Sequence, residues 1–212
     1  MNRRADCGRL RSRPGHSGYA ILARVRIVAL VALVALALVV GAAACGGKSD
    51  TDSPATLGAS ALPGLESRSR TLDTGTLAQD SFGPTELAEL LEDAGYVSGS
   101  EREFYGRTDT FDHVVARALR FESAEGAEAY LGWLGGHADE ILGRVEPEAP
   151  LPLGESGLLF SLVPCGTCKK ELATFLAAWR RGETVLSLLA AGPGASTDSL
   201  EQLGRELDRV TG

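Results

Sequence analysis

The chain has 212 residues, enough for one domain with a substantial core. Its formal net charge is −7, but seven of the 21 basic residues and only one of the 28 acidic residues precede Cys45, so the part from Cys45 onward has a net charge of −13. This acidity excludes a basic surface for nucleic acid or for anionic lipid head groups.

The N-terminal part of the chain has the three parts of an export signal. Arg24 and Arg26 provide positive charge before an apolar run of 14 residues, 27–40, and small residues then lead to Cys45. A run of this length is typical of a signal peptide, whereas a membrane span needs about 20 residues. We therefore expect residues 1–44 to be a signal peptide with a basic N-terminal region. An uncleaved signal anchor and an ordinary secretory signal cut just before Cys45 are alternatives.

The motif Ala42-Ala43-Ala44-Cys45 resembles the lipobox of bacterial lipoproteins, with Ala42 where that class usually has leucine or another larger aliphatic residue. The resemblance implies that a diacylglycerol is attached to Cys45 and that cleavage makes this cysteine the first residue. Two or three acyl chains, such as palmitate, are sufficient for stable anchoring. The resemblance thus implies a lipid-anchored protein on the extracytoplasmic face of the cell membrane.

The segment of residues 45–70 is rich in Ser, Thr, Gly, Ala and Pro. Such a composition buries too little apolar surface to become ordered, so we expect a flexible tether between the lipidated cysteine and the domain. Residues 62–65, Leu-Pro-Gly-Leu, are expected to pack on the edge of the domain. The folded, extracytoplasmic domain is expected to span residues 71–212.

The periodicity of apolar residues predicts an α+β domain. We expect, in order, a helix at 84–94, strands at 101–107 and 111–121, a helix at 123–141, a strand at 158–163, a hairpin of strands at 173–179 and 184–191, and a helix at 199–210. Pro84 and Ser123 favour helix starts, and Gly135-Gly136 is expected to bend or split the second helix. Residues 173–179 also fit a helix. The order α-β-β-α-β-β-β-α favours an antiparallel sheet with helices packed on it.

The predicted order of helices and strands, together with two sequence stretches, resembles a family of sensor domains. The stretch FESAEGA at 121–127 enters a helix with Trp133, and the stretch WRRGETVL at 179–186 precedes the C-terminal helix. This arrangement looks like the extracellular sensor-type domain of actinobacterial serine/threonine kinases and of related lipoproteins, over residues 83–212. The resemblance implies an extracytoplasmic module that senses a ligand or a partner. The sequence lacks the kinase, and its cysteines do not match the two disulfides of that family.

Cys165 and Cys168 have only each other as partners, because Cys7 is removed with the signal peptide and Cys45 is lipidated. In an oxidising compartment this pair is expected to form a disulfide across a tight turn. A thioredoxin-like redox pair is an alternative, because a strand, a CxxC motif and a helix superficially resemble that family, and a thiol at a helix N-terminus is reactive. Only 44 residues follow Cys168, too few for the remaining sheet of that fold.

Other motifs for chemistry are missing from the sequence. His113 and His137 would complete a set of four zinc ligands with the cysteine pair, but their spacing matches no zinc-site pattern, so we expect no metal and no cofactor. The GxSxG, P-loop, HExxH and EF-hand patterns are also missing. Trp133 and Trp179 are expected to pack in the core or at its edge.

The sequence therefore predicts a membrane-anchored lipoprotein that is not an enzyme and that binds a small ligand or an envelope protein. A membrane-tethered thiol–disulfide oxidoreductase that uses Cys165 and Cys168 is one alternative. A structural envelope protein is another.

Overall fold

The computed structural model of the chain describes residues 53–79, 84–163 and 172–212. The chain divides into two compact units, residues 1–48 and 49–212, and all described residues belong to the second unit. None of the helices in these ranges is both long and apolar enough to cross a membrane. Cys45 and the pair Cys165 and Cys168 lie outside the described residues.

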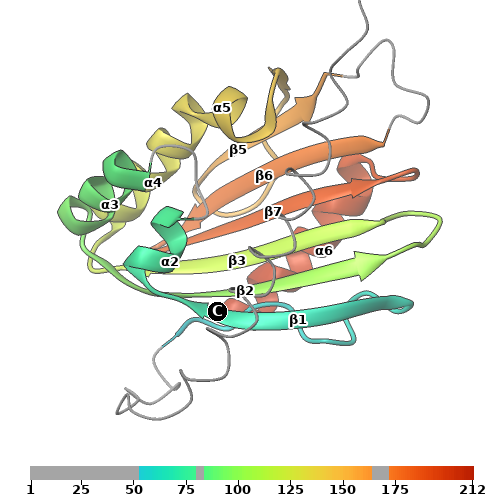
Figure 1. Cartoon of the computed structure of the whole chain (residues 1–212), viewed down its shortest axis with the longest axis horizontal. Coiled ribbons are helices and arrows are strands. Elements are labelled where there is room, and N and C mark those ends of the chain that lie inside the picture. The colour runs from blue at the N-terminus through green and yellow to red at the C-terminus, as the bar shows by residue number, and fades with distance from the viewer. Residues whose placement is uncertain (1–52, 80–83, 164–171) are drawn as a thin grey trace, which may run out of the picture. The chain divides into compact units, whose positions relative to one another are not determined.

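Seven strands of the described part form one antiparallel sheet, in the order β1-β2-β3-β7-β6-β5-β4 (Figure 1). They are β1 (Leu65–Leu72), β2 (Tyr96–Gly106), β3 (His113–Phe121), β4 (Val145–Pro147), β5 (Ser156–Leu162), β6 (Ala173–Arg181) and β7 (Thr184–Gly192). The centre of the sheet is the β3–β7 pair, which runs from His113 opposite Ala191 to Arg120 opposite Thr184. This pairing joins the two halves of the domain sequence.

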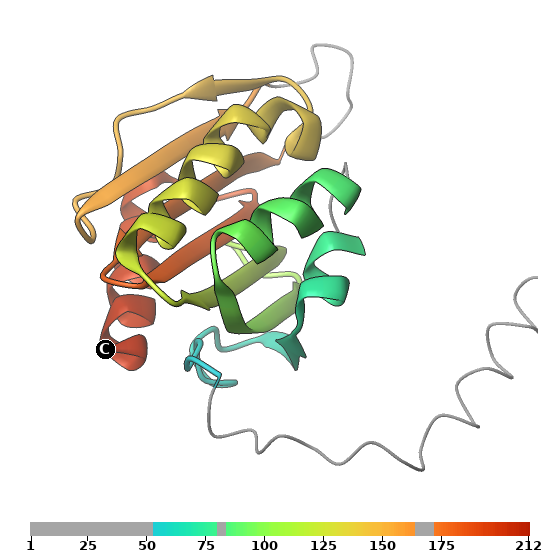
Figure 2. The same cartoon turned by 90° about the vertical axis from the view of Figure 1, so that its left-hand side faces the viewer.

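The helices cover the two faces of the sheet unequally (Figure 2). On one face lie α2 (Thr74–Gln79), α3 (Pro84–Asp93), α4 (Ala124–Gly136) and α5 (Ala138–Leu142). On the other face lies α6 (Thr197–Thr211). A single sheet therefore separates two hydrophobic cores.

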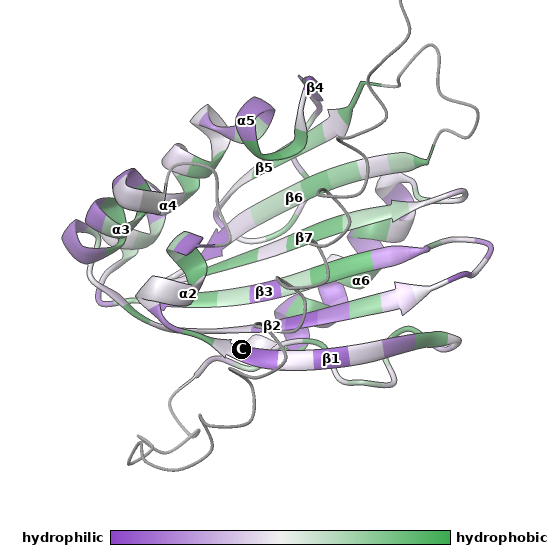
Figure 3. Ribbon diagram, viewed as in Figure 1, coloured by the Kyte–Doolittle hydropathy of each residue, from purple (hydrophilic) through white to green (hydrophobic). Residues whose placement is uncertain are grey.

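Successive side chains of a strand point to opposite faces of the sheet, so the apolar residues of one strand contribute to both cores. On β3, Val114 and Ala116 belong to the core under α6, whereas Leu119 and Phe121 belong to the core under α3 and α4. Trp179 on β6 is 1% exposed and lies in the α6 core. Figure 3 shows the resulting apolar colour along the central strands β3, β7 and β6.

The start of α4 lies where the sequence indicates, whereas α6 starts at Thr197, two residues before the predicted Ser199. The Ser123 side chain accepts a hydrogen bond from the N–H of Gly126 at 3.1 Å and caps α4. The predicted interruption at Gly135-Gly136 is confirmed, because α4 ends at Gly136 and α5 starts at Ala138. Leu200, Leu203 and Leu207 of α6 are buried, as their helical spacing predicts.

The predicted α+β class, antiparallel sheet and packed helices are confirmed, but the predicted order of elements is incomplete. Residues 173–179 form a strand and not the alternative helix. The structure adds β1, α2 and β4 to the predicted order, and the expected split of the helix at 123–141 gives α4 and α5. These additions are short or polar: α2 has 6 residues, β4 has 3, and β1 has one fully buried side chain, Leu72.

The segment before residue 71 is more ordered than the expected tether. Leu57 is 0% exposed and packs in the α6 core, and all of β1 pairs with β2, from Leu65 opposite Gly106 to Leu72 opposite Gly99. Backbone hydrogen bonds to β2 hold this segment in place, although its side chains bury little apolar surface. The expectation of a free tether is therefore corrected for the described residues 53–70.

Candidate functional site

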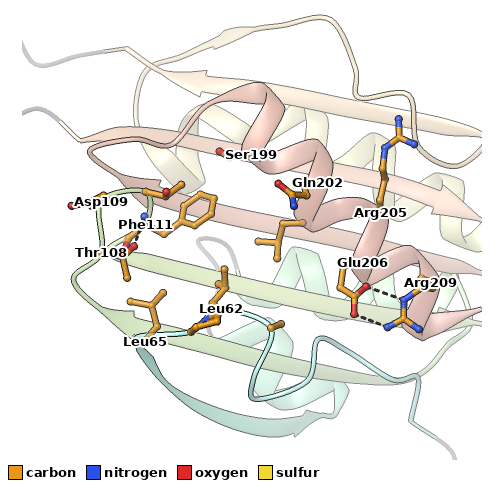
Figure 4. Close-up of a pocket in the computed structure, with 14 residues that line it drawn as sticks. Leu62, Leu65, Thr108, Asp109, Phe111, Ser199, Gln202, Arg205, Glu206 and Arg209 are labelled. Carbon is orange, nitrogen blue, oxygen red and sulfur yellow. Dashed lines mark hydrogen bonds and ion pairs between the residues drawn. The ribbon is translucent and has the colours of Figure 1, made fainter.

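A groove of about 820 Å³ lies beside α6 and is called here the α6 groove. Three segments that are distant in the sequence line it (Figure 4). These are the N-terminal segment with Ala61, Leu62, Pro63 and Leu65, the β2–β3 loop with Thr108, Asp109, Thr110 and Phe111, and α6 with Ser199, Gln202, Leu203, Arg205, Glu206 and Arg209. The groove thus has an apolar floor and a polar rim.

Helix α6 forms one wall of the α6 groove and starts at a capping box. The N–H of Ser199 donates to the Ser196 side chain at 3.3 Å, and the N–H of Ser196 donates to the Ser199 hydroxyl oxygen at 3.0 Å. The face with Leu200 and Leu207 points into the core, and the neighbouring face presents Gln202 to the groove. The cap fixes where this wall begins.

The β2–β3 loop forms the end of the α6 groove and is held by several hydrogen bonds. The Thr108 hydroxyl donates to the Phe111 carbonyl at 2.7 Å, and the Phe111 N–H donates to the Thr108 hydroxyl oxygen at 2.9 Å. A Cβ on Gly192 would lie 2.1 Å from the Thr110 carbonyl oxygen, so only glycine allows the end of β7 to approach the loop this closely. Phe111 is 5% exposed and forms part of the floor.

The N-terminal segment closes the α6 groove on its third side. Leu62 and Leu65 are partly buried against the α6 core. The Thr211 hydroxyl at the end of α6 donates to the Ala55 carbonyl at 3.0 Å, which links this segment to the helix. The predicted packing of residues 62–65 on the domain edge is confirmed.

The rim of the α6 groove carries ion pairs along α6. Arg209 donates from Nε and Nη2 to the two carboxylate oxygens of Glu206, at 2.9 and 2.6 Å. This hydrogen bonding lowers the pKa of Glu206 and raises that of Arg209. Arg205 pairs with Glu201 on the same helix. The rim therefore presents charges of both signs to a ligand.

The lining of the α6 groove has the composition of a binding site. The Ser199 hydroxyl in this lining donates to the Ser196 carbonyl at 2.9 Å. An apolar floor with a few polar groups at the rim is typical of a site for a ligand or a peptide.

The two predicted candidate histidines lie in separate environments. His113 Nε2 lies 2.8 Å from Glu103 Oε1 on the neighbouring strand. His137 caps α4, its Nδ1 lies 2.9 Å from the Trp133 carbonyl oxygen, and its ring stacks on Trp133 at 4.6 Å. Within residues 53–79, 84–163 and 172–212, no group of three or more His, Cys, Asp or Glu is placed to hold a metal ion.

The two tryptophans pack as predicted. Trp179 is buried in the α6 core, and its indole N–H donates to Asp208 Oδ1 at 3.3 Å. Trp133 packs against the other core beside Tyr130, with 6.1 Å between the ring centroids. Sequence reasoning did not find the α6 groove, because its three walls meet only after β3 pairs with β7.

No protein-family model and no curated protein matches the chain. Among solved structures, the chain is similar to a crystal structure of the extracellular domain of PknH from Mycobacterium tuberculosis. The two have 12% identical residues and a TM-score of 0.48, over 69% of this chain and 84% of the other. At this level the likeness assigns no ligand, partner or residue role to this chain.

Proposed function

We propose that the protein is a membrane-anchored extracytoplasmic lipoprotein that binds a small ligand or a segment of an envelope protein in the α6 groove, without catalysis. The observation that carries this proposal is the α6 groove itself, about 820 Å³ with an apolar floor and a rim of paired charges. Its walls are held by a capped helix, a hydrogen-bonded loop and a packed N-terminal segment. A groove fixed before binding loses less conformational freedom when a ligand enters.

The proposed lipid anchor is inferred from the N-terminal sequence up to Cys45. The positive residues, the apolar run of 14 residues and the small residues before Cys45 fit export and lipidation. An acidic domain is repelled by anionic head groups, so contact with the membrane would pass through the lipid and not through the domain surface. The proposed ligand would then meet the domain on the extracytoplasmic side.

The intact mass of the membrane-extracted protein tests the anchor. A mass equal to the chain from Cys45 plus two or three acyl chains supports it, and an unlipidated full-length mass overturns it. Alkylation in the same experiment reports on Cys165 and Cys168. A pair that reacts only after strong reduction supports a structural disulfide, whereas a pair that reacts readily, together with insulin reduction, favours the oxidoreductase alternative.

The melting temperature tests the binding function. Fractions of an envelope extract that contain the ligand should raise the melting temperature of the protein, because binding to the folded state alone stabilises it. Gln202→Trp fills the α6 groove from the exposed side of α6 and should abolish the rise. Thr197→Trp, on the same helix but outside the groove lining, should keep it. An equal rise in both variants would place binding elsewhere, and no rise with any fraction would favour the structural alternative.

A further inference from the structure

The face of the sheet opposite α6 has two adjoining hollows. One is an apolar cavity of about 240 Å³ beneath α4 and α5, and the other is a polar depression of about 510 Å³ over β1, β2 and β3. Both are lined by Val115 and Arg117 of β3. The two hollows therefore adjoin at these residues, and we call the pair the trough.

The apolar cavity lies between the helices and the central strands. Leu134 of α4 and Ile141 of α5 line it from above, and Leu176 of β6 and Leu189 of β7 line it from the sheet. Its volume is about eight times the roughly 30 Å³ that a water molecule occupies in the liquid. A methylene group is similar in size to water, so the cavity suits a chain of medium length.

The polar depression, which we call the arginine depression, is lined by the charged side chains Arg68, Arg70, Glu101, Glu103 and Arg117. Three guanidinium groups share two carboxylates: Arg70 and Arg117 bind Glu101 at 2.8 and 2.6 Å, and Arg68 binds Glu103 at 2.5 Å. The five groups together carry a charge of +1. In a domain with a net charge of −13, this is a local region that favours an anion.

We propose that this trough binds a single-chain amphiphile with an anionic head group, such as a medium-chain carboxylate. The chain lies in the apolar cavity beneath α4 and α5, and the carboxylate lies over the arginine depression, next to Arg117 at the junction. Arg68 is 75% exposed, so its guanidinium has N–H groups available to a head group beyond the bond to Glu103. The site is on the other face of the sheet from the α6 groove and does not depend on the function proposed there.

Trp133 lines the apolar cavity and Trp179 lies in the α6 core on the other face, and the chain contains only these two tryptophans. The probe is 10-bromodecanoate, whose bromine quenches indole fluorescence at short range. With the full chain in nanodiscs of zwitterionic lipid, we expect saturable quenching that remains in Trp179→Phe and disappears in Trp133→Phe. Quenching that rises linearly without saturation in all variants, as partitioning into the disc would give, overturns the proposal.

Two matched pairs of variants locate the probe. Val115→Phe blocks the junction of the trough and should weaken binding at least tenfold, whereas Val97→Phe, at an exposed position of β2 outside both hollows, should not. Arg68→Glu reverses an exposed charge in the arginine depression and should weaken binding at least fivefold, whereas Arg205→Glu on α6 should not. Because Arg68 is exposed, its variant tests the proposal even when Val115→Phe fails to fold. Equal binding by both members of either pair overturns it.

The head group is tested with 10-bromodecanol, which has the same chain without the charge. We expect it to bind at least tenfold more weakly than 10-bromodecanoate, and we expect Arg68→Glu to leave its binding unchanged. Equal affinities for the alcohol and the carboxylate would overturn the assignment of an anionic head group.

Discussion

Nε of Arg117 donates a hydrogen bond to Oε2 of Glu101 at 2.6 Å, across the neighbouring strands β3 and β2. Nε of Arg70 on β1 donates to the other oxygen of the same carboxylate at 2.8 Å. Glu101 is 4% exposed, so two arginines from the flanking strands compensate the charge of a buried carboxylate. A buried charge is tolerated only with such partners.

Arg117→Gln should lower the free energy of unfolding by about 2 kcal/mol, less than the roughly 3–5 kcal/mol lost when a fully buried pair is broken. The smaller loss is expected because Arg70 remains bound to Glu101 and because the Arg117 side chain is 30% exposed. Urea unfolding of the variant measures this loss. The double variant Glu101→Gln/Arg117→Gln should lose less than the sum of the two single variants, and additive losses would contradict a direct interaction.

The same carboxylate should make stability depend on pH in the acidic range. Burial alone raises the pKa of Glu101, but hydrogen bonds and charges from Arg70 and Arg117 lower it below its ordinary value of 4.5. A carboxylate with a lowered pKa in the folded state stabilises the fold at higher pH, and this stabilisation is lost as the pH falls through the folded-state pKa. We therefore expect the free energy of unfolding to decrease below about pH 4.5.

Glu101→Gln is the comparison for this pH dependence. The variant cannot lose a carboxylate charge at position 101. Its free energy of unfolding should therefore fall less steeply between pH 5 and pH 3 than that of the natural protein. The lowered pKa of Glu103 adds a decrease in the same direction. Unfolding at each pH, followed by circular dichroism, gives the two curves. Parallel curves would show that Glu101 keeps the same pKa when the chain unfolds.

Two glycines of α4 give opposite predictions. A Cβ on Gly126 would lie 1.9 Å from the Ala94 carbonyl oxygen, where α4 crosses the end of α3. Gly126→Ala should therefore destabilise the protein by about 1–3 kcal/mol through overpacking. A Cβ on Gly132 meets nothing within 4 Å, so Gly132→Ala should stabilise the protein by about 0.5–1 kcal/mol through helix propensity.

Thermal unfolding of both glycine variants tests the packing of α4 on α3. The two substitutions add the same methyl group to the same helix, so each is the control for the other. A Gly126→Ala variant as stable as Gly132→Ala would show that α4 does not pack against Ala94 as closely as described.

The elements that the sequence predicted are those with a strong apolar period. In α6, Leu200, Leu203 and Leu207 recur at helical spacing and all three are buried. The hairpin of β6 and β7 was predicted from alternation and from the turn at Gly182, which has a φ of +57° that glycine adopts readily. In both cases the local pattern and the tertiary packing agree.

The elements that the sequence missed are stabilised by partners and not by their own pattern. The strand β1 carries Arg68 and Arg70 on the side that faces Glu103 and Glu101, and its pairing with β2 is what orders it. A sequence with alternating charged and small polar residues resembles a linker until its partner strand is known. The α6 groove and the trough could not be predicted for the same reason, since each joins side chains from at least three separate segments.

The rim of the α6 groove can be altered with little effect on stability. Arg209 is 68% exposed and its partner Glu206 is 43% exposed, and an exposed ion pair contributes little to stability because water and salt screen it. Arg209→Ala should therefore leave the free energy of unfolding nearly unchanged. Because Arg209 lines the groove, the same variant should weaken binding of a ligand that contacts the rim by about tenfold, the loss of one charge-assisted hydrogen bond.

Arg144→Ala is the control for this rim variant, because Arg144 is exposed on the loop before β4 and lies outside the groove lining. Both variants should unfold at the same urea concentration as the natural protein, and only Arg209→Ala should reduce the rise in melting temperature caused by an active envelope fraction. An equal reduction in both would indicate a general effect of net charge on the ligand. Full binding by Arg209→Ala would place the bound molecule on the floor formed by Phe111 and Leu203 and away from the rim.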